Sequence, residues 1–145
     1  MSTTALSRAG IIGPMAPISI DAVDGLTVQS VMHAQLTALP ATATVGDVRD
    51  YFAASTSRRL AFVVDDDQRF VGSLTPAHVG EGDPARPAAE VADPGPTVSP
   101  DAPAATGRDL ALQTDTRRVP VVDGGGRLVG IVAVTGDLQS FCGTG

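Results

Sequence analysis

The hydrophobic and polar positions of the chain follow one pattern twice, in which helical spacing gives way to short runs of β-forming residues. In the first copy, Val45, Val48 and Phe52 recur at helical spacing, and Thr44 with Asp47 has the arrangement of a capping box. Two apolar runs separated by a polar turn then predict an antiparallel hairpin. The expected elements are a helix at 44–57, strands at 61–64 and 70–74, and a short helix at 76–80.

The second copy repeats this order after a break rich in glycine and proline at 80–87. Asp101 can cap its helix, although Pro103 must then lie in the first turn and Gly107 weakens the middle. The triplet 124–126 joins two strands, so its glycines indicate a hairpin turn and not a phosphate loop, which leads from a strand into a helix. The expected elements are strands at 97–98, 119–122 and 128–134, a helix at 101–113, and a final helical turn at 136–141.

Matching residues mark the two hairpins as copies of one unit. Arg58 and Arg117 lie 59 positions apart, and Asp65 and Asp123 lie 58 apart. Units of this size are too small to bury their own hydrophobic faces, so we expect the copies to pack together and the function to lie between them. The predicted division is an N-terminal extension or strap at 1–25, a first unit at 26–82, a linker at 83–88 and a second unit at 89–142.

Composition excludes several classes of function. The 145 residues carry a net charge of −6, whereas a nucleic-acid partner would require a basic face. The longest apolar run, 128–134, is far below the roughly 20 residues of a membrane span, and Cys142 is the only cysteine. We therefore expect a soluble, cytoplasmic protein without a disulfide, a membrane partner or a nucleic-acid partner.

The sequence contains no recognisable catalytic or metal-binding constellation. His33 and His78 have no cysteine or second histidine at ligand spacing, so we expect neither an enzyme nor a metal site. An arginine pair precedes the first hairpin strand of each copy, at 58–59 and 117–118. These arginines could receive phosphates at a cleft edge, but exposed arginines more commonly stay solvated or pair with carboxylates, here Asp50 and Asp109.

The second hairpin resembles a known family. The sequences at 118–123 (RVPVVD) and 127–132 (RLVGIV), and more loosely 61–75, resemble those of a tandem CBS-domain pair, or Bateman module. Residues 28–32 look like the entry helix of that family, and 89–93 repeat it. The resemblance, which covers about 26–142, implies an α/β (α+β) fold of two tandem β-α-β-β-α motifs packed around a pseudo-two-fold axis.

The resemblance also implies a site. Clefts between the two copies of such modules take AMP, ATP or S-adenosylmethionine, and a Thr or Ser with an Asp three positions later holds the ribose. The first copy has Thr75 but His78 in the Asp place, and an imidazole cannot accept two hydroxyl hydrogen bonds as a carboxylate does. We therefore expect a weaker site there.

In the second copy Ala133 replaces the Thr. The expected contacts are Val119, Pro120 and Val121 for adenine, Thr135 or Asp137 for ribose, and Arg117 or Arg118 for phosphate.

Together these features predict a non-catalytic regulatory or sensor module with an adenosine nucleotide as its candidate ligand and no certain cofactor. The alternative is a ligand-free structural or protein-interaction module with the same fold. A homodimer is expected, because apolar residues on the helices after Thr44 and Asp101 would otherwise stay exposed and the family usually closes this surface by two-fold association. Coverage by residues 1–25 is the alternative to dimerisation.

Overall fold

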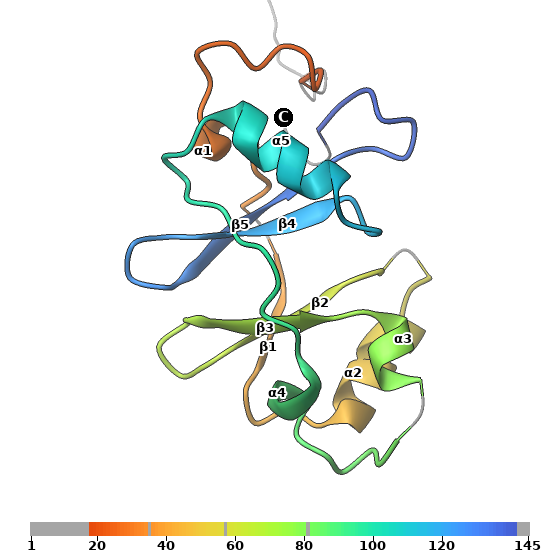
Figure 1. The fold of residues 1–145 in the computed structure, drawn as a ribbon. Helices are drawn as coiled ribbons and strands as arrows, with labels where there is room; N and C mark the ends of the chain where they lie inside the picture. Colours follow the sequence, from red (N-terminus) through yellow and green to blue (C-terminus); the bar gives the residue numbers. More distant parts are fainter. Residues whose placement is uncertain (1–17, 35, 57, 81, 142–145) are drawn as a thin grey trace, which may run out of the picture.

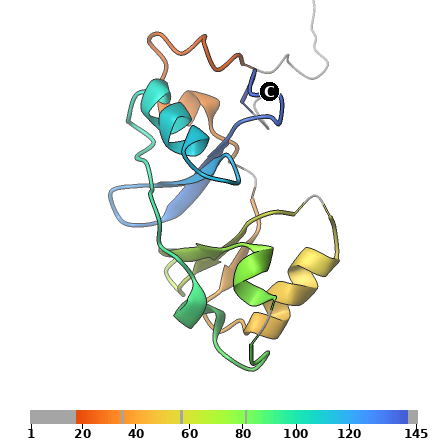
Figure 2. The same ribbon diagram turned by 45° about the vertical axis from the view of Figure 1, so that its right-hand side comes forward.

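The computed structural model describes residues 18–34, 36–56, 58–80 and 82–141. Figures 1 and 2 show two stacked halves, with the strands of both halves in the middle and the helices on the two outer sides. This mixture of helices and small sheets confirms the predicted α+β class. The elements are α1 (Val28–Val31), β1 (Ala38–Pro40), α2 (Val45–Ala53), β2 (Ala61–Val64), β3 (Phe70–Leu74), α3 (Pro76–Val79), α4 (Ala88–Val91), α5 (Ala104–Leu112), β4 (Arg118–Val122) and β5 (Leu128–Ala133).

The first half is a three-stranded sheet in the order β1-β2-β3, in which β1 pairs parallel and β3 antiparallel with β2. Every residue of β2 is buried, and α2 and α3 pack nearby. The predicted capping box starts α2: the Asp47 backbone N–H donates to Thr44 Oγ1 at 3.2 Å, and the Thr44 N–H donates to Asp47 Oδ2 at 2.9 Å. The helix ends at Ala53, four residues before the predicted end.

In the second half, β4 pairs with β5 under α5. The segment that leads into this half differs from the predictions in two places. α5 begins at Ala104 with Pro103 as its N-cap, so the expected cap at Asp101 is wrong. The Asp101 backbone N–H instead donates to the Ser99 hydroxyl at 3.2 Å, within the turn before the helix. The strand expected at 97–98 is reduced to a single parallel bridge between Val98 and Val121.

The final helical turn predicted at 136–141 is also wrong. Two backbone N–H groups that a helix would pair with carbonyl oxygens are hydrogen-bonded to side chains instead. The Ser140 N–H donates to Thr135 Oγ1, and the Gln139 N–H donates to Asp137 Oδ1. Leu138 has a positive φ of 61°, which reverses the chain. Phe141 therefore returns to pair with Val134 and is fully buried in the second core.

Each short entry helix packs in the half that is opposite to its place in the sequence. α1 precedes the first sheet, but Val28 and Val31 are fully buried in the core of the second half, against α5 and β5. α4 precedes the second sheet, but its Ala88 is buried in the first core and the helix packs on β3. The two halves therefore complete one another's cores.

Two glycines of the sequence repeat allow these exchanged segments to pass. Asp93 pairs with Ser73 beside Gly72, and His33 pairs with Ile131 beside Gly130. A Cβ atom on Gly72 would lie 2.8 Å from the Ala92 Cβ, and one on Gly130 would lie 2.6 Å from a side-chain atom of Met32. The glycine in RFVG and RLVG is thus required by close approach of a neighbouring segment.

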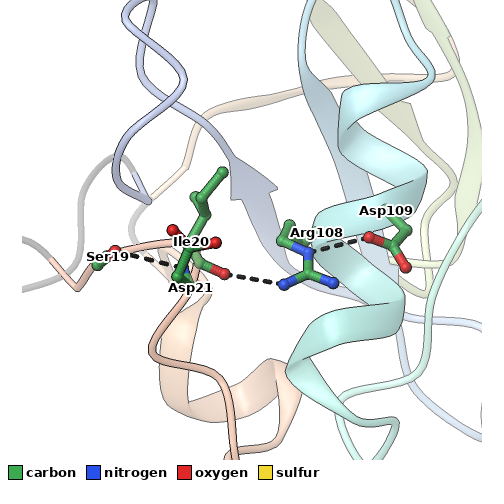
Figure 3. Close-up of polar contacts among 5 residues, drawn as sticks. All are labelled: Ser19, Ile20, Asp21, Arg108 and Asp109. Atoms are coloured by element: carbon green, nitrogen blue, oxygen red, sulfur yellow. Dashed lines mark hydrogen bonds and ion pairs between the residues drawn. The ribbon is translucent and has the colours of Figure 1, made fainter.

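The segment 18–24 lies over the second half, where Figure 3 shows its polar link to α5. Arg108 on α5 donates from Nη1 to the Ile20 carbonyl at 3.0 Å and from Nε to the Asp109 carboxylate at 2.9 Å. Ile20 and Val23 pack against the second core. The rest of the predicted strap, residues 1–17, and Cys142 lie outside the described residues.

Candidate functional site

A pocket of about 300 Å³ opens between the two halves. Its first wall comes from the end of β3 and from α3, and its opposite wall comes from the turn between α5 and β4. The segment that follows α4 closes one side. The lining residues are Leu60, Ser73, Thr75, His78, Asp93, Pro94, Gly95, Pro96, Thr114, Asp115, Thr116, Arg118 and Pro120.

A second hollow of about 430 Å³ adjoins this pocket. Thr75, Asp115 and Thr116 line both spaces, so the two are neighbours across a shared wall. The second hollow adds the first arginine pair, Arg58 and Arg59. Together they form a groove whose inner part combines apolar residues with polar ones, and whose outer part carries two arginines beside Asp115.

The three arginines of the groove are held differently. Arg58 donates to the Tyr51 carbonyl at 2.8 Å, and its guanidinium lies 4.3 Å from the centre of the Tyr51 ring. Arg118 donates from Nη1 to the Thr116 carbonyl at 2.9 Å. Arg59 is exposed and makes no hydrogen bond or ion pair with another described residue. Arg59 is therefore the guanidinium of the groove that can reach a ligand without breaking an internal contact.

Asp50 and Asp109, the carboxylates considered as partners for the arginine pairs, form no ion pair with Arg58 or Arg59. Asp109 pairs with Arg108 instead, because both lie on α5. Arg58 uses the Tyr51 carbonyl in place of Asp50.

Thr75 and His78 form a capping box at the start of α3. The Thr75 backbone N–H donates to His78 Nδ1 at 3.0 Å. This bond orients the imidazole at the edge of the pocket, where the family pattern would have a carboxylate.

The expected ligand-binding residues of the second copy are separated in the structure. Arg118 and Pro120 line the pocket, together with Thr75 and His78 of the predicted weaker site. Val119 and Val121 are fully buried in the second core, so their side chains do not face this pocket. Thr135 and Asp137 lie in the C-terminal turn and line neither hollow.

The Asp137 carboxylate is already hydrogen-bonded within its own turn. The Thr135 hydroxyl and the Gln139 backbone N–H donate to its exposed carboxylate, and these bonds lower its pKa below the usual value. Arg117 has a positive φ of 57°, and its buried Nε has no hydrogen-bond partner among the described residues. Arg117 lines neither hollow.

Sequence reasoning missed Leu60 and Ser73 as lining residues, and it missed two whole segments of the pocket, 93–96 and 114–116. The first contains a Pro-Gly-Pro sequence directly after the second entry helix, and that signal could have indicated a crossing segment. The second is a turn whose Thr114 hydroxyl accepts from the Arg118 N–H at 3.0 Å, and nothing in its sequence marks it as part of a site.

The described ranges contain neither a metal-ligand cluster nor a helix that could span a membrane. No group of three or more His, Cys, Asp or Glu residues there could hold a metal ion. No helix in the same ranges has the length and apolar character that crossing a membrane requires.

The sequence profile of the CBS domain matches residues 28–79 and 88–135, which are the two repeated units with their entry helices. The chain belongs to the CBS-domain family. The predicted tandem CBS pair is thereby confirmed. A search of curated proteins finds no match.

Solved structures support this assignment. The CBS domains of a transcriptional regulator from Streptococcus pneumoniae are 25% identical, with a TM-score of 0.66 over 76% of this chain and 94% of that one. The cytosolic domain of the Mg²⁺ channel MgtE in complex with ATP is 29% identical, with a TM-score of 0.61 over 71% of this chain. A cystathionine beta-synthase pair domain from Shewanella oneidensis MR-1 is 18% identical, with a TM-score of 0.64 over 70% of this chain. This CBS pair spans 44% of the MgtE domain and 61% of the Shewanella domain.

Proposed function

We propose that this CBS pair is a non-catalytic regulatory module that binds an adenosine nucleotide in the groove between its two motifs. The observation that carries the proposal is the pair of adjoining hollows around Thr75, one lined by both apolar and polar residues and the other carrying two arginines. A concave pocket in which polar groups converge beside apolar surface is a common setting for a small-molecule site. The ATP complex of the similar MgtE domain adds support for this ligand class.

The walls suggest how the ligand would lie. Leu60, Pro94, Pro96 and Pro120 offer apolar surface to a planar base in the inner pocket. Arg59 offers an uncommitted guanidinium to phosphate oxygens in the outer hollow, where a planar fork of donors suits an oxyanion. ATP, AMP and S-adenosylmethionine differ in the charge of the group that would lie in the outer hollow, so their affinities should differ.

Calorimetry with ATP tests this proposal. We expect Arg59→Ala to weaken ATP binding by about tenfold to a hundredfold, since a hydrogen bond to a charged group contributes about 1.5–3 kcal/mol. Arg127→Ala is the matched control, because Arg127, like Arg59, is exposed and lies just before a strand, but it lines neither hollow. Its affinity for ATP should equal that of the wild type. Equal affinities for all three proteins would reject the Arg59 contact.

The site expected from the sequence remains a prediction and is tested in the same series. If Asp137→Ala weakens binding and Arg59→Ala does not, the ribose lies at the C-terminal turn and the groove proposed above is wrong. If no adenosine nucleotide produces heat with the wild type, the alternative of a ligand-free interaction module is favoured.

A homodimer is proposed as the assembly. In the first half, Tyr51 and Phe52 on α2 are only partly buried, and their rings meet edge to face with centroids 5.7 Å apart. The described part of the strap covers the second half instead, through Arg108 and Ile20.

We expect light scattering at tens of micromolar to give twice the mass of the chain. A Tyr51→Glu variant should shift this mass toward the monomer, because burying a carboxylate at an apolar contact is costly. A wild-type mass equal to one chain would contradict the dimer.

A further inference from the structure

The contact between His78 and Thr75 determines which nitrogen of the imidazole carries the proton. The Thr75 backbone N–H points at Nδ1 from 3.0 Å. A backbone N–H can only donate, so Nδ1 must be the unprotonated acceptor and Nε2 carries the proton of the neutral ring. The Thr75 hydroxyl lies 3.4 Å from the same Nδ1. Nε2–H is thus the remaining polar group of His78, and it has no partner among the described residues.

The other capping box of the chain shows that this position does not need a histidine. At the start of α2, Asp47 accepts the Thr44 N–H at 2.9 Å through one carboxylate oxygen, and its second oxygen remains an acceptor. His78 performs the same task for Thr75 but leaves a donor. Both residue types accept the backbone N–H of the capping threonine, yet they give opposite hydrogen-bonding character to whatever lies beside them. His78 lies beside the pocket.

We propose that His78 is a specificity-determining residue that donates its Nε2–H to a phosphate oxygen of the ligand and offers no acceptor to the ribose hydroxyl groups at this position. The inference rests on the proposed function for the nucleotide. Other donors surround the same point: the Thr75 hydroxyl and Arg118 line the pocket, and Arg58 and Arg59 line the adjoining hollow. An acceptor-only group such as phosphate matches these donors better than a diol does.

Two carboxylates also face the pocket and restrict where the phosphate can lie. Asp93 accepts the Gly95 N–H at 3.0 Å, and Asp115 lies on the wall shared by the two hollows. Both repel an anion, so they direct the phosphate toward His78 and the arginines. They also leave acceptors for hydrogen atoms elsewhere on the ligand, such as those of an amino group.

Asparagine and aspartate at position 78 provide a matched pair of variants. Either side chain can accept the Thr75 N–H through one oxygen, after which Asn presents a donor and Asp presents an acceptor. We expect the wild type and His78→Asn to bind ATP and 2′-deoxy-ATP within about threefold of each other. His78→Asp should bind ATP more weakly than the wild type and should prefer ATP over 2′-deoxy-ATP by about tenfold, as a new charged acceptor for the 2′-hydroxyl predicts. A tenfold preference for ATP in the wild type would overturn the proposal.

Two NMR measurements separate this inference from the nucleotide proposal. Long-range ¹H–¹⁵N correlation spectra of the wild type should show His78 with an unprotonated Nδ1, and His78→Asn assigns the signals against His33. Titration with pyrophosphate should then shift the Nε2 signal of His78. If pyrophosphate shifts it but no nucleotide binds, the nucleotide proposal fails and the donor role stands. If nucleotides bind but Nδ1 carries the proton, the donor role fails alone. If nucleotides bind but leave the His78 signals unchanged, the donor role fails alone. If neither pyrophosphate nor any nucleotide binds, both fail.

Discussion

A chain that ends at Gly82 should show no cooperative unfolding transition. The truncation removes α4, whose buried Ala88 belongs to the first core, and it removes all of the second-half partners of Val28 and Val31. Burying a Val side chain contributes about 1.5–3 kcal/mol, so exposing these two removes much of the 5–15 kcal/mol that stabilises a typical domain. Urea unfolding followed by circular dichroism, together with the dispersion of amide NMR signals, measures the result.

Fragment complementation provides the control for this prediction. A second fragment that starts at Asp83 supplies α4, α5 and the second hairpin, so mixing it with the first should restore a cooperative transition. The intact chain gives the reference curve. A sharp transition and dispersed amide signals from the first fragment alone, as a monomer, would show that the halves do not depend on one another.

Gly72→Ala should destabilise the protein by about 1–3 kcal/mol, the usual cost of inserting a methyl group into a packed region. The new Cβ would lie 2.8 Å from the Ala92 Cβ and 3.1 Å from backbone carbon atoms of Ala92 and Asp93. Neither neighbour has a flexible side chain at the contact, so the segment after α4 must shift. Thermal or urea unfolding measures the change in the free energy of unfolding.

Two other glycines serve as controls for Gly72. Gly124→Ala should change the free energy of unfolding by no more than about 0.5 kcal/mol, because its Cβ would meet no atom within 4 Å. Gly130→Ala should fall between the two, since its closest contact is with the flexible Met32 side chain although the His33 carbonyl lies 3.2 Å away. An equal effect at positions 72 and 124 would refute the close-approach explanation.

Local patterns were sufficient to predict the hairpins and the first capped helix. Short runs of β-forming apolar residues separated by polar turns identify β2, β3, β4 and β5, and the Thr44–Asp47 capping box forms as expected. The final helical turn could not be predicted, because the side chains of Thr135 and Asp137 hydrogen-bond the local backbone and the burial of Phe141 depends on distant residues. A pattern of local spacing contains no information about either effect.

The candidate site also has one part that the sequence could predict and one part that depends on the tertiary structure. The sequence alone identified Thr75, His78, Arg118 and Pro120 as candidates, but it assigned them to two separate clefts. The tertiary structure brings all four to one pocket and buries Val119 and Val121 beside it. Neighbouring residues of a strand face opposite sides, so spacing alone cannot say which of them meets a surface from the other half.

The repeat, the hairpins and the CBS-pair family are therefore properties that the sequence by itself determined, because short-range periodicity and turn chemistry are encoded within a few residues of one another. Only the tertiary structure decided that α1 and α4 exchange halves, and that the groove joins α3 to the turn before β4. These features depend on contacts between residues that are distant in the chain, where the burial of Val28, Val31 and Ala88 selects one packing among several that the same local elements allow.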